Sequence, residues 1–272
     1  MTTDQKTFLI PAGILEISGE EAQIFLHAQF TTDINKLGKG QVQFSAWCNP
    51  KGRVISTFYL FNTGNQYFLL LPKELKDNFY KRLKMFVLRS KVVITDRSDD
   101  IHCLCTNENM PEADNTFSFQ IPGTQDHHIL FGEALEELPD SDGWQLHTIL
   151  SGIPWLNNKN TEEYLPQELN LEQLDALSFK KGCFPGQEIV ARVHYRGQVK
   201  RGMKQATIAV GQTVDTGMKL YTQEEERSIG TVLNCSRHMD NHIAALVVVD
   251  NDYMDAQQLF LNNINGPIVT LR

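Results

Sequence analysis

After Gly202 the chain breaks into six short apolar runs separated by turns, a pattern that leaves few folds open. Such runs, evenly spaced, are typical of a small antiparallel barrel or sandwich of about 70 residues. We therefore place a domain boundary near residues 196–202. The expected strands are Gln205–Val210, Lys219–Tyr221, Gly230–Asn234, Ile243–Val249, Gln258–Phe260 and Ile268–Leu271.

Residues 45–97 carry the pattern of a compact α+β unit. The turn residues Asn62–Asn65 separate two apolar runs in the manner of a β-hairpin. Apolar residues then recur at helical spacing from Leu75 to Phe86. The segment therefore reads as β-β-α-β, with strands expected at Gln43–Trp47, Val54–Phe61, Tyr67–Leu71 and Lys91–Thr95.

The segments on either side of this unit are less regular. Upstream, a strand is expected at Ile14–Ile17, and the spacing of Ser18 and Glu21 fits a capping box that begins a helix. Downstream, the signal weakens over residues 98–143. The remaining expectations are a short helix at Glu133–Glu137, a strand at Trp144–Leu150 and a helix at Leu171–Leu177.

The composition is that of an ordinary globular chain, with 41% hydrophobic and 21% charged residues. No apolar run approaches the roughly 20 residues that cross a bilayer, and no basic stretch precedes an apolar core at the N-terminus. We therefore expect a cytoplasmic protein with no membrane partner. A net charge of −8 disfavours general binding to phosphate backbones, although Arg192–Arg201 form a local basic stretch.

The five cysteines are odd in number and widely spaced, which does not indicate a disulfide framework. Cys103 and Cys105 form a C-x-C pair, a spacing that can bind metal. The same two residues alternate along an expected strand, so the other interpretation is a pair of free thiols packed on a sheet face. A closed zinc site needs four ligands, and no second pair lies nearby in the sequence.

The main candidate for chemistry is Cys183, in the segment from Ser178 to Glu188. Lys180, Lys181 and Arg192 are positive charges that favour a thiolate. A helix that opens after Gly186 would add the positive end of its dipole. The alternative is a small buried residue at a tight turn between two glycines.

The segment Ser178–Glu188 resembles the K-G-C-[YF]-x-G-Q-E signature of the YgfZ family, whose members bind folate and are connected with iron–sulfur clusters. The resemblance continues through Arg192–Arg201. It covers nearly the whole chain except residues 98–143. Weaker matches occur in family order at Gln29–Asp33, Asn49–Arg53, Gly152–Pro154 and Leu165–Asn170.

The YgfZ family is similar to the glycine-cleavage T-protein, an aminomethyltransferase that uses tetrahydrofolate. The resemblance implies an α+β fold with three domains in a ring around a folate channel, two of them α+β and the third a C-terminal antiparallel β-barrel. On this basis residues 1–44 and 98–196 form a split α+β domain, residues 45–97 an inserted β-β-α-β domain, and residues 197–272 the barrel.

By the same resemblance, Cys183 and Lys181 form the catalytic pair, and the side chains of Gln187 and Glu188 brace their loop. Trp144 and Arg192 are assigned to the cofactor, tetrahydrofolate, since an indole stacks well on a flat pterin ring. The alternative for Trp144 is a core residue at the start of a strand. No residue is assigned to a metal.

This chain departs from the T-protein pattern at positions that matter for transfer chemistry. Ser56 and Thr57 stand where T-proteins carry adjacent aspartates, and a hydroxyl does not replace a carboxylate as general base near neutral pH. Leu150 stands where a glutamate pairs with the pterin, and Ala12 where the family has a second tryptophan. Aminomethyl transfer is therefore disfavoured, and the folate anchor is weakened.

The leading hypothesis is a YgfZ-like, folate-binding accessory protein for the assembly or repair of iron–sulfur clusters, which supports tRNA-modifying iron–sulfur enzymes through a reactive Cys183. One cysteine cannot hold a cluster alone, so iron–sulfur carriers or client proteins are the expected partners, with tRNA an indirect one. The alternatives are a tetrahydrofolate-dependent aminomethyltransferase and a non-catalytic folate- or RNA-binding module. Whether the protein is an enzyme stays open.

The roles of the residues after Arg192 stay open as well. His194 is either a ligand or proton carrier, or a structural residue. Arg196, Lys200 and Arg201 either contact a folate tail, a protein or RNA, or form a solvated basic edge.

Overall fold

The computed structural model describes residues 7–108, 116–122, 124, 127–133, 135, 142–209, 213–237, 242–256 and 258–272. The expected helix at Glu133–Glu137 and the last residue of the strand expected at Gln205–Val210 reach outside these residues. No helix in the described part of the chain is long and apolar enough to span a bilayer.

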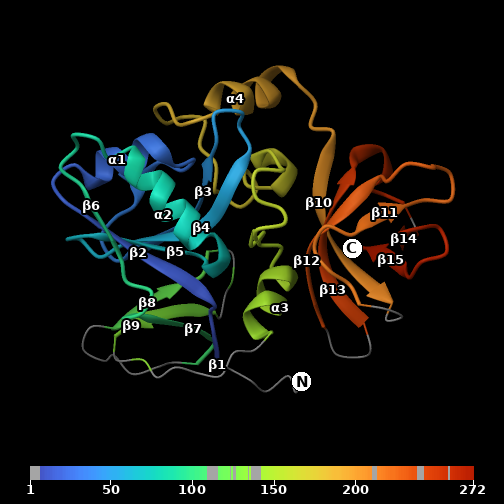
Figure 1. The fold of residues 1–272 in the computed structure, drawn as a ribbon, viewed down its shortest axis with the longest axis horizontal. Coiled ribbons are helices and arrows are strands. Elements are labelled where there is room, and N and C mark those ends of the chain that lie inside the picture. The colour runs from blue at the N-terminus through green and yellow to red at the C-terminus, as the bar shows by residue number, and fades with distance from the viewer. Residues whose placement is uncertain are drawn as a thin grey trace.

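The N-terminal half is built around a five-stranded antiparallel sheet in the order β3-β4-β5-β2-β6 (Figure 1). Its elements are β2 (Ala12–Ser18), α1 (Ala22–Gln29), β3 (Gln41–Cys48), β4 (Val54–Asn62), β5 (Tyr67–Pro72), α2 (Lys76–Met85) and β6 (Val93–Asp96). The hairpin expected between residues 54 and 71 is confirmed by the pairing of β4 with β5.

Both faces of this sheet are covered, which explains why β4 is a nearly continuous apolar run. On one face, Leu15 and Ile17 pack with Phe25 of α1 and Phe79 of α2 in a core made only of residues between 15 and 94. Residues from the other face, such as Tyr59, belong to a second core that also contains parts of the barrel.

The strand pairing places the first residues differently from our expectation. The resemblance groups residues 1–44 with residues 98–196, but β2 pairs with β5 and β6, and β3 pairs with β4. β2 carries apolar residues that belong to both cores, and it lies inside the sheet between β5 and β6. Only β1 (Thr7–Leu9), before it, pairs with a later strand, β7. The division into three domains stays a prediction.

A smaller four-stranded sheet, β1-β7-β9-β8, lies below the first in Figure 1. Its later strands are β7 (His102–Thr106), β8 (Thr116–Gln120) and β9 (His128–Gly132). Cys103 and Cys105 lie on β7 as free, buried thiols. The interpretation of these two cysteines as packed residues is therefore confirmed.

Two helix and strand expectations in the middle of the chain are wrong. Residues Gly143–Leu150 form the helix α3 rather than a strand, because Trp144, Thr148 and Ile149 make one buried helical face. Leu171–Leu177 form a series of turns rather than a helix, in which Asp175 takes a left-handed backbone with a φ of 53°. The helix α4 (Gln187–Arg196) follows and lies at the top of Figure 1.

The C-terminal part is a closed antiparallel barrel, β10-β13-β12-β11-β14-β15, in which β15 pairs back with β10 (Figure 1). Alternate residues of its strands, such as Val247 and Val249, fill a separate core. The barrel expected from the six apolar runs is thus confirmed. Its strands are β10 (Arg201–Ala209), β11 (Lys219–Tyr221), β12 (Gly230–Arg237), β13 (His242–Asp250), β14 (Leu259–Leu261) and β15 (Ile268–Leu271).

Candidate functional site

The loop that carries Cys183 begins against the end of α1. Thr31 lies two residues beyond α1, and its hydroxyl donates a hydrogen bond to the carbonyl of Ala176 over 2.6 Å. The amide of Ser178 in turn donates to the carbonyl of Thr31 over 2.9 Å. Since Thr31 is fully buried, these bonds hold the start of the loop firmly to the N-terminal half.

The other end of the loop is fixed by a close approach of two glycines. Gly186 precedes α4 with a φ of +78°, a left-handed backbone that suits glycine. A Cβ added there would lie 2.6 Å from the Cα of Gly52, in the turn between β3 and β4. Gly52 has a φ of +74° itself. The thiol loop therefore fits against this turn only while position 186 has no side chain.

Lys181 anchors the middle of the loop to the C-terminal end of α1. Its ammonium donates hydrogen bonds to the carbonyls of His27 and Phe30, which the helix leaves without partners. It also lies 5.4 Å from the centre of the Phe184 ring. Burial lowers the pKa of Lys181 to about 8, against the opposing influence of Asp33 and Cys183. Its position is that of a helix cap, as well as a charge near the thiol.

His27 and Asp33 join this group, and the sequence reasoning did not single them out. His27 Nδ1 lies 3.3 Å from Asp33 Oδ1, and its Nε2 would be 3.5 Å from a Cβ placed on Gly182, the residue before Cys183. Burial and the charge of Lys181 lower the pKa of His27, against the effect of Asp33. A neutral imidazole beside the thiol loop is able to accept a proton. The matched stretch Gln29–Asp33 was a signal for Asp33; His27 had none.

Of the five cysteines, Cys183 is the exposed one. Burial raises the pKa of the other four thiols, to about 11 for Cys235 and about 12 for Cys105. The thiolate is the reactive form, so those four are suppressed. Chemistry that needs a thiolate at the surface falls to Cys183. Within the described residues, no three His, Cys, Asp or Glu side chains group as metal ligands.

The expected bracing role of Gln187 and Glu188 is not seen. The amide of Gln187 donates to the carbonyl of Phe184 over 3.1 Å, but neither side chain hydrogen-bonds to any residue that the structure describes. Instead, Gln167 reaches α4 from outside and donates to the carbonyl of Val190 over 2.7 Å.

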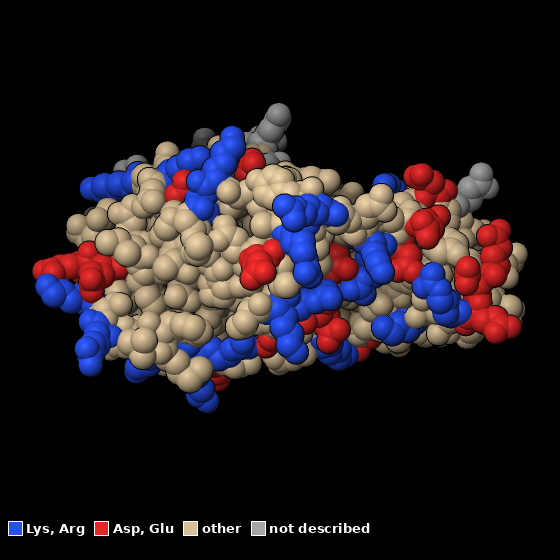
Figure 2. Space-filling view, turned by 90° about the horizontal axis from the view of Figure 1, so that it is seen from above, with Lys and Arg blue, Asp and Glu red and all other residues tan. Residues whose placement is uncertain are grey.

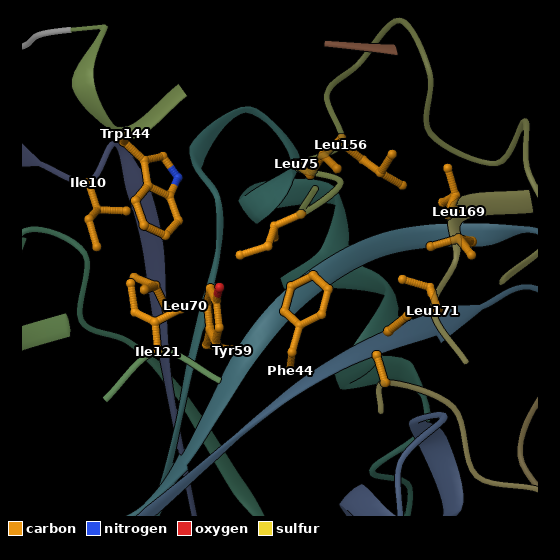
Figure 3. Packing of buried hydrophobic residues seen from close by; sticks show 14 of the residues in the cluster. Ile10, Phe44, Tyr59, Leu70, Leu75, Ile121, Trp144, Leu156, Leu169 and Leu171 are labelled. Carbon is orange, nitrogen blue, oxygen red and sulfur yellow. The ribbon is translucent and has the colours of Figure 1, made fainter. Parts of the chain in front are cut away.

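Trp144 lies in a buried aromatic group some distance from the thiol loop. Its ring centre is 6.3 Å from that of Tyr59, 5.3 Å from that of Trp155 and 5.6 Å from that of His147. The indole Nε1, the Tyr59 hydroxyl and His147 Nε2 are buried and have no hydrogen-bond partner among the residues that the structure describes. In Figure 3 the indole nitrogen and the Tyr59 hydroxyl are turned toward the side where Leu75 lies.

These three polar atoms provide a test of whether a pterin suits the group. Buried polar atoms normally form hydrogen bonds, so three without a partner suggest that a ligand completes the group. Because the atoms lie among aromatic rings, a flat ligand with hydrogen-bond donors and acceptors would suit them. Burial and the neighbouring His127 lower the pKa of His147 to about 4, so its imidazole is neutral. The aromatic rings and unpaired polar atoms of this group are therefore of the types that bind a pterin ring.

Arg192 does not lie with this group. It is exposed on α4, at the top of Figure 1, whereas α3 with Trp144 lies lower in the molecule. The structure therefore brings Lys181 and Cys183 together, and separates Trp144 from Arg192.

The positions that depart from the T-protein pattern are occupied in a way that leaves no general base. Thr57 is fully buried and donates its hydroxyl to the carbonyl of Pro154 over 2.6 Å. Ser56, also buried, donates to the carbonyl of Thr57 over 3.0 Å. Leu150 ends α3 with 48% of its surface exposed, and Ala12 begins β2 opposite Pro72. None of these side chains offers a carboxylate.

No family model matches the chain. An uncharacterised protein of Haemophilus influenzae is 32% identical over 259 residues, which cover 92% of this chain and 90% of that protein. The tRNA-modifying protein YgfZ of Photobacterium profundum is 30% identical over 278 residues, with coverages of 92% and 84%. Its counterpart in Vibrio atlanticus is 29% identical over 272 residues, with coverages of 89% and 83%.

The fold is shared with a solved structure. The crystal structure of the glycine cleavage system aminomethyltransferase T from Bartonella henselae aligns with a TM-score of 0.73 and covers 98% of this chain and 84% of its own, at 14% identity. The expected T-protein-like fold class is therefore confirmed. Together with the identities over nearly full length, the comparisons establish that the chain belongs to the YgfZ family.

Proposed function

We propose that this protein is a cytoplasmic, folate-binding accessory factor that serves the assembly or repair of iron–sulfur clusters and so supports tRNA-modifying enzymes. The observation that carries the proposal is the exposed Cys183 on a loop held at both ends, beside Lys181 and His27. The name of its relatives, tRNA-modifying protein, supports the link to tRNA modification.

In this proposal Cys183 acts on iron or sulfur that belongs to a partner. A thiolate is the ligand that iron–sulfur clusters prefer, and the exposed position allows another protein to reach it. The remaining thiols of this chain are buried or half-buried, so the other ligands come from the carrier or client protein. His27 accepts the thiol proton, and the ammonium of Lys181 stabilises the resulting negative charge.

Tetrahydrofolate, the proposed cofactor, would be held by Trp144, Tyr59 and Trp155, whose rings and unpaired polar atoms fit a pterin. When bound, it would supply a reduced pterin able to carry a one-carbon group. Ser56 and Thr57 are committed to backbone carbonyls, so these two positions do not supply the carboxylate base that aminomethyl transfer uses. A role as transferase is therefore the weaker candidate.

The thiol proposal is tested by anaerobic transfer of a cluster from a loaded carrier to an apo client, followed by the client's absorbance. Cys183→Ala is expected to abolish the acceleration that the wild-type protein gives. Cys235→Ala, at the half-buried thiol, is the matched control and is expected to leave the acceleration unchanged. Equal acceleration by wild type and Cys183→Ala would end the proposal.

The folate proposal is tested by titrating tetrahydrofolate against tryptophan fluorescence. Trp144→Phe is expected to remove most of the quenching, whereas Trp47→Phe, in the other core, is expected to keep it. Turnover of an aminomethyl donor with tetrahydrofolate would instead favour the transferase. Quenching combined with cluster transfer that does not need Cys183 would favour a non-catalytic binding module.

A further inference from the structure

The surface around α4 is basic although the chain as a whole is acidic. Between residues 179 and 204 there are seven basic residues and one acidic residue, Glu188, in a chain with a net charge of −8. Figure 2 shows Lys and Arg side chains gathered in a band across the middle of the face seen from above, the side on which α4 lies in Figure 1. The seven are Lys180, Lys181, Arg192, Arg196, Lys200, Arg201 and Lys204.

Three of these charges are free to meet a ligand. Arg192, Arg196 and Lys200 are exposed, and their side chains form no ion pair or hydrogen bond with any described residue. Arg192 and Arg196 are four residues apart on α4, so they lie on the same face of the helix. Lys181, by contrast, is committed to α1, and Arg201 to Glu168 at 3.0 Å.

An exposed aromatic ring stands among these cations. Tyr195 has 68% of its surface exposed, yet it rests edge-on against His194 with 4.6 Å between ring centres. His194 stacks on Phe179 at 4.0 Å, and its Nδ1 lies 3.2 Å from a Glu172 carboxylate oxygen. His194 therefore acts as a support that orients Tyr195. Such a fixed, exposed ring between arginines is a platform for stacking a base.

A cleft of about 1220 Å³ continues the surface beyond the end of α4. Its lining includes Lys200 and Arg201 at the start of β10, Arg53 from the turn between β3 and β4, and Arg227 from the barrel. Glu168, only 5% exposed, lies between Arg53 and Arg201 at 3.0 Å from each, so it holds both guanidinium groups in place. Asp250 pairs with Arg227 at 2.6 Å, which offsets the positive charge of that guanidinium group.

We propose that α4 and this cleft bind a single-stranded segment of RNA, with phosphates on Arg192, Arg196 and Lys200 and a base stacked on Tyr195. Stacking explains the supported, exposed ring, for which an acidic protein surface has no particular use. The choice of RNA over DNA rests on the proposed function, in which the clients act on tRNA. The inference gives the chain direct contact with RNA, a point that the sequence left open.

The test uses the full chain and a fluorescein-labelled, single-stranded RNA of about 15 nucleotides, followed by anisotropy at several salt concentrations. Three phosphate contacts give a slope of log affinity against log salt of about −2. The double variant Arg192→Gln/Arg196→Gln is expected to make this slope shallower by about 1.4. Tyr195→Ala is expected to weaken binding by about 5-fold to 150-fold and to leave the slope unchanged.

The matched control is Lys81→Gln/Arg89→Gln, which removes two exposed, unpaired cations of the described chain near α2. It is expected to keep wild-type affinity and slope. Equal loss in the control, or full affinity in Tyr195→Ala, would overturn the proposal. So would equal binding of DNA of the same sequence, or displacement of the RNA by a polyglutamate peptide. Cluster transfer measured without RNA stays normal in Tyr195→Ala, so failure of this inference is distinguishable from failure of the thiol proposal.

Discussion

The partly buried ammonium of Lys181 predicts a change of stability with pH that its removal should abolish. Its pKa falls from 10.5 to about 8 in the folded protein, mainly because of burial. Between these two values the unfolded chain holds a proton that the folded chain has released. The free energy of unfolding therefore rises with pH across this window through this group. The shift corresponds to about 3 kcal/mol, and partial exposure reduces it to about 2 kcal/mol.

The measurement is urea unfolding of wild type and Lys181→Met at several pH values from 7 to 10.5. The stability of the variant relative to wild type is expected to fall by about 2 kcal/mol between pH 8 and pH 10.5. Groups whose pKa burial raises, such as Cys235 and Tyr67, are present in both proteins and cancel in the difference. Loss of the hydrogen bonds of Lys181 lowers the free energy of unfolding by a similar amount at every pH. The change in slope with pH therefore reports the proton of Lys181 alone.

Lys180→Met is the control, because Lys180 is the exposed neighbour on the same loop. Its curve is expected to run parallel to that of wild type. Parallel curves for Lys181→Met as well would refute the reasoning that burial of this ammonium in the folded state lowers its affinity for a proton.

Three further outcomes follow from the same geometry. Gly186→Ala is expected to destabilise the protein by about 3 kcal/mol or more in urea unfolding, because the added Cβ would overlap the turn at Gly52. Gly40→Ala is the control and should cost only about 1 kcal/mol, because position 40 has a similar φ of +73° but open space around it. Equal losses would contradict this. Iodoacetamide at pH 8 should label Cys183 alone in peptide mapping, and labelling of a second thiol at a similar rate would be inconsistent with the burial described. Glu168→Ala should cost about 1.5 to 3 kcal/mol, because it removes a buried carboxylate that pairs with two half-exposed guanidinium groups. Glu163→Ala, at an exposed glutamate, should cost less than about 1 kcal/mol. Similar small losses for both variants would show that the two pairs of Glu168 contribute little.

The barrel could be predicted from the sequence because each of its strands is a contiguous apolar run between turns. The helix α3 could not, since its residues satisfy two periods at once. Trp144, Leu146, Thr148 and Leu150 alternate as in a strand, while Trp144, Thr148 and Ile149 form a helical face. Packing of that helical face into the core decided between them.

The candidate site was predictable only in its local part. Cys183 and Lys181 belong to one continuous signature, so the resemblance located both. His27 could not be located in this way, because the bond between Lys181 and its carbonyl spans 154 positions in the chain. Similarly, position 186 needs glycine because it lies against Gly52, and a contact between residues so far apart in the sequence leaves no local pattern.

The attachment of the thiol loop to α1 and to the turn at Gly52 has a consequence for the order of synthesis. The sheet and the core that carry both attachment points are complete once about residue 96 has left the ribosome. Cys183 emerges 87 residues later, or about 4 to 17 s at usual rates of translation. The receiving surface is therefore folded before the cysteine exists, and the thiol is positioned as soon as it emerges.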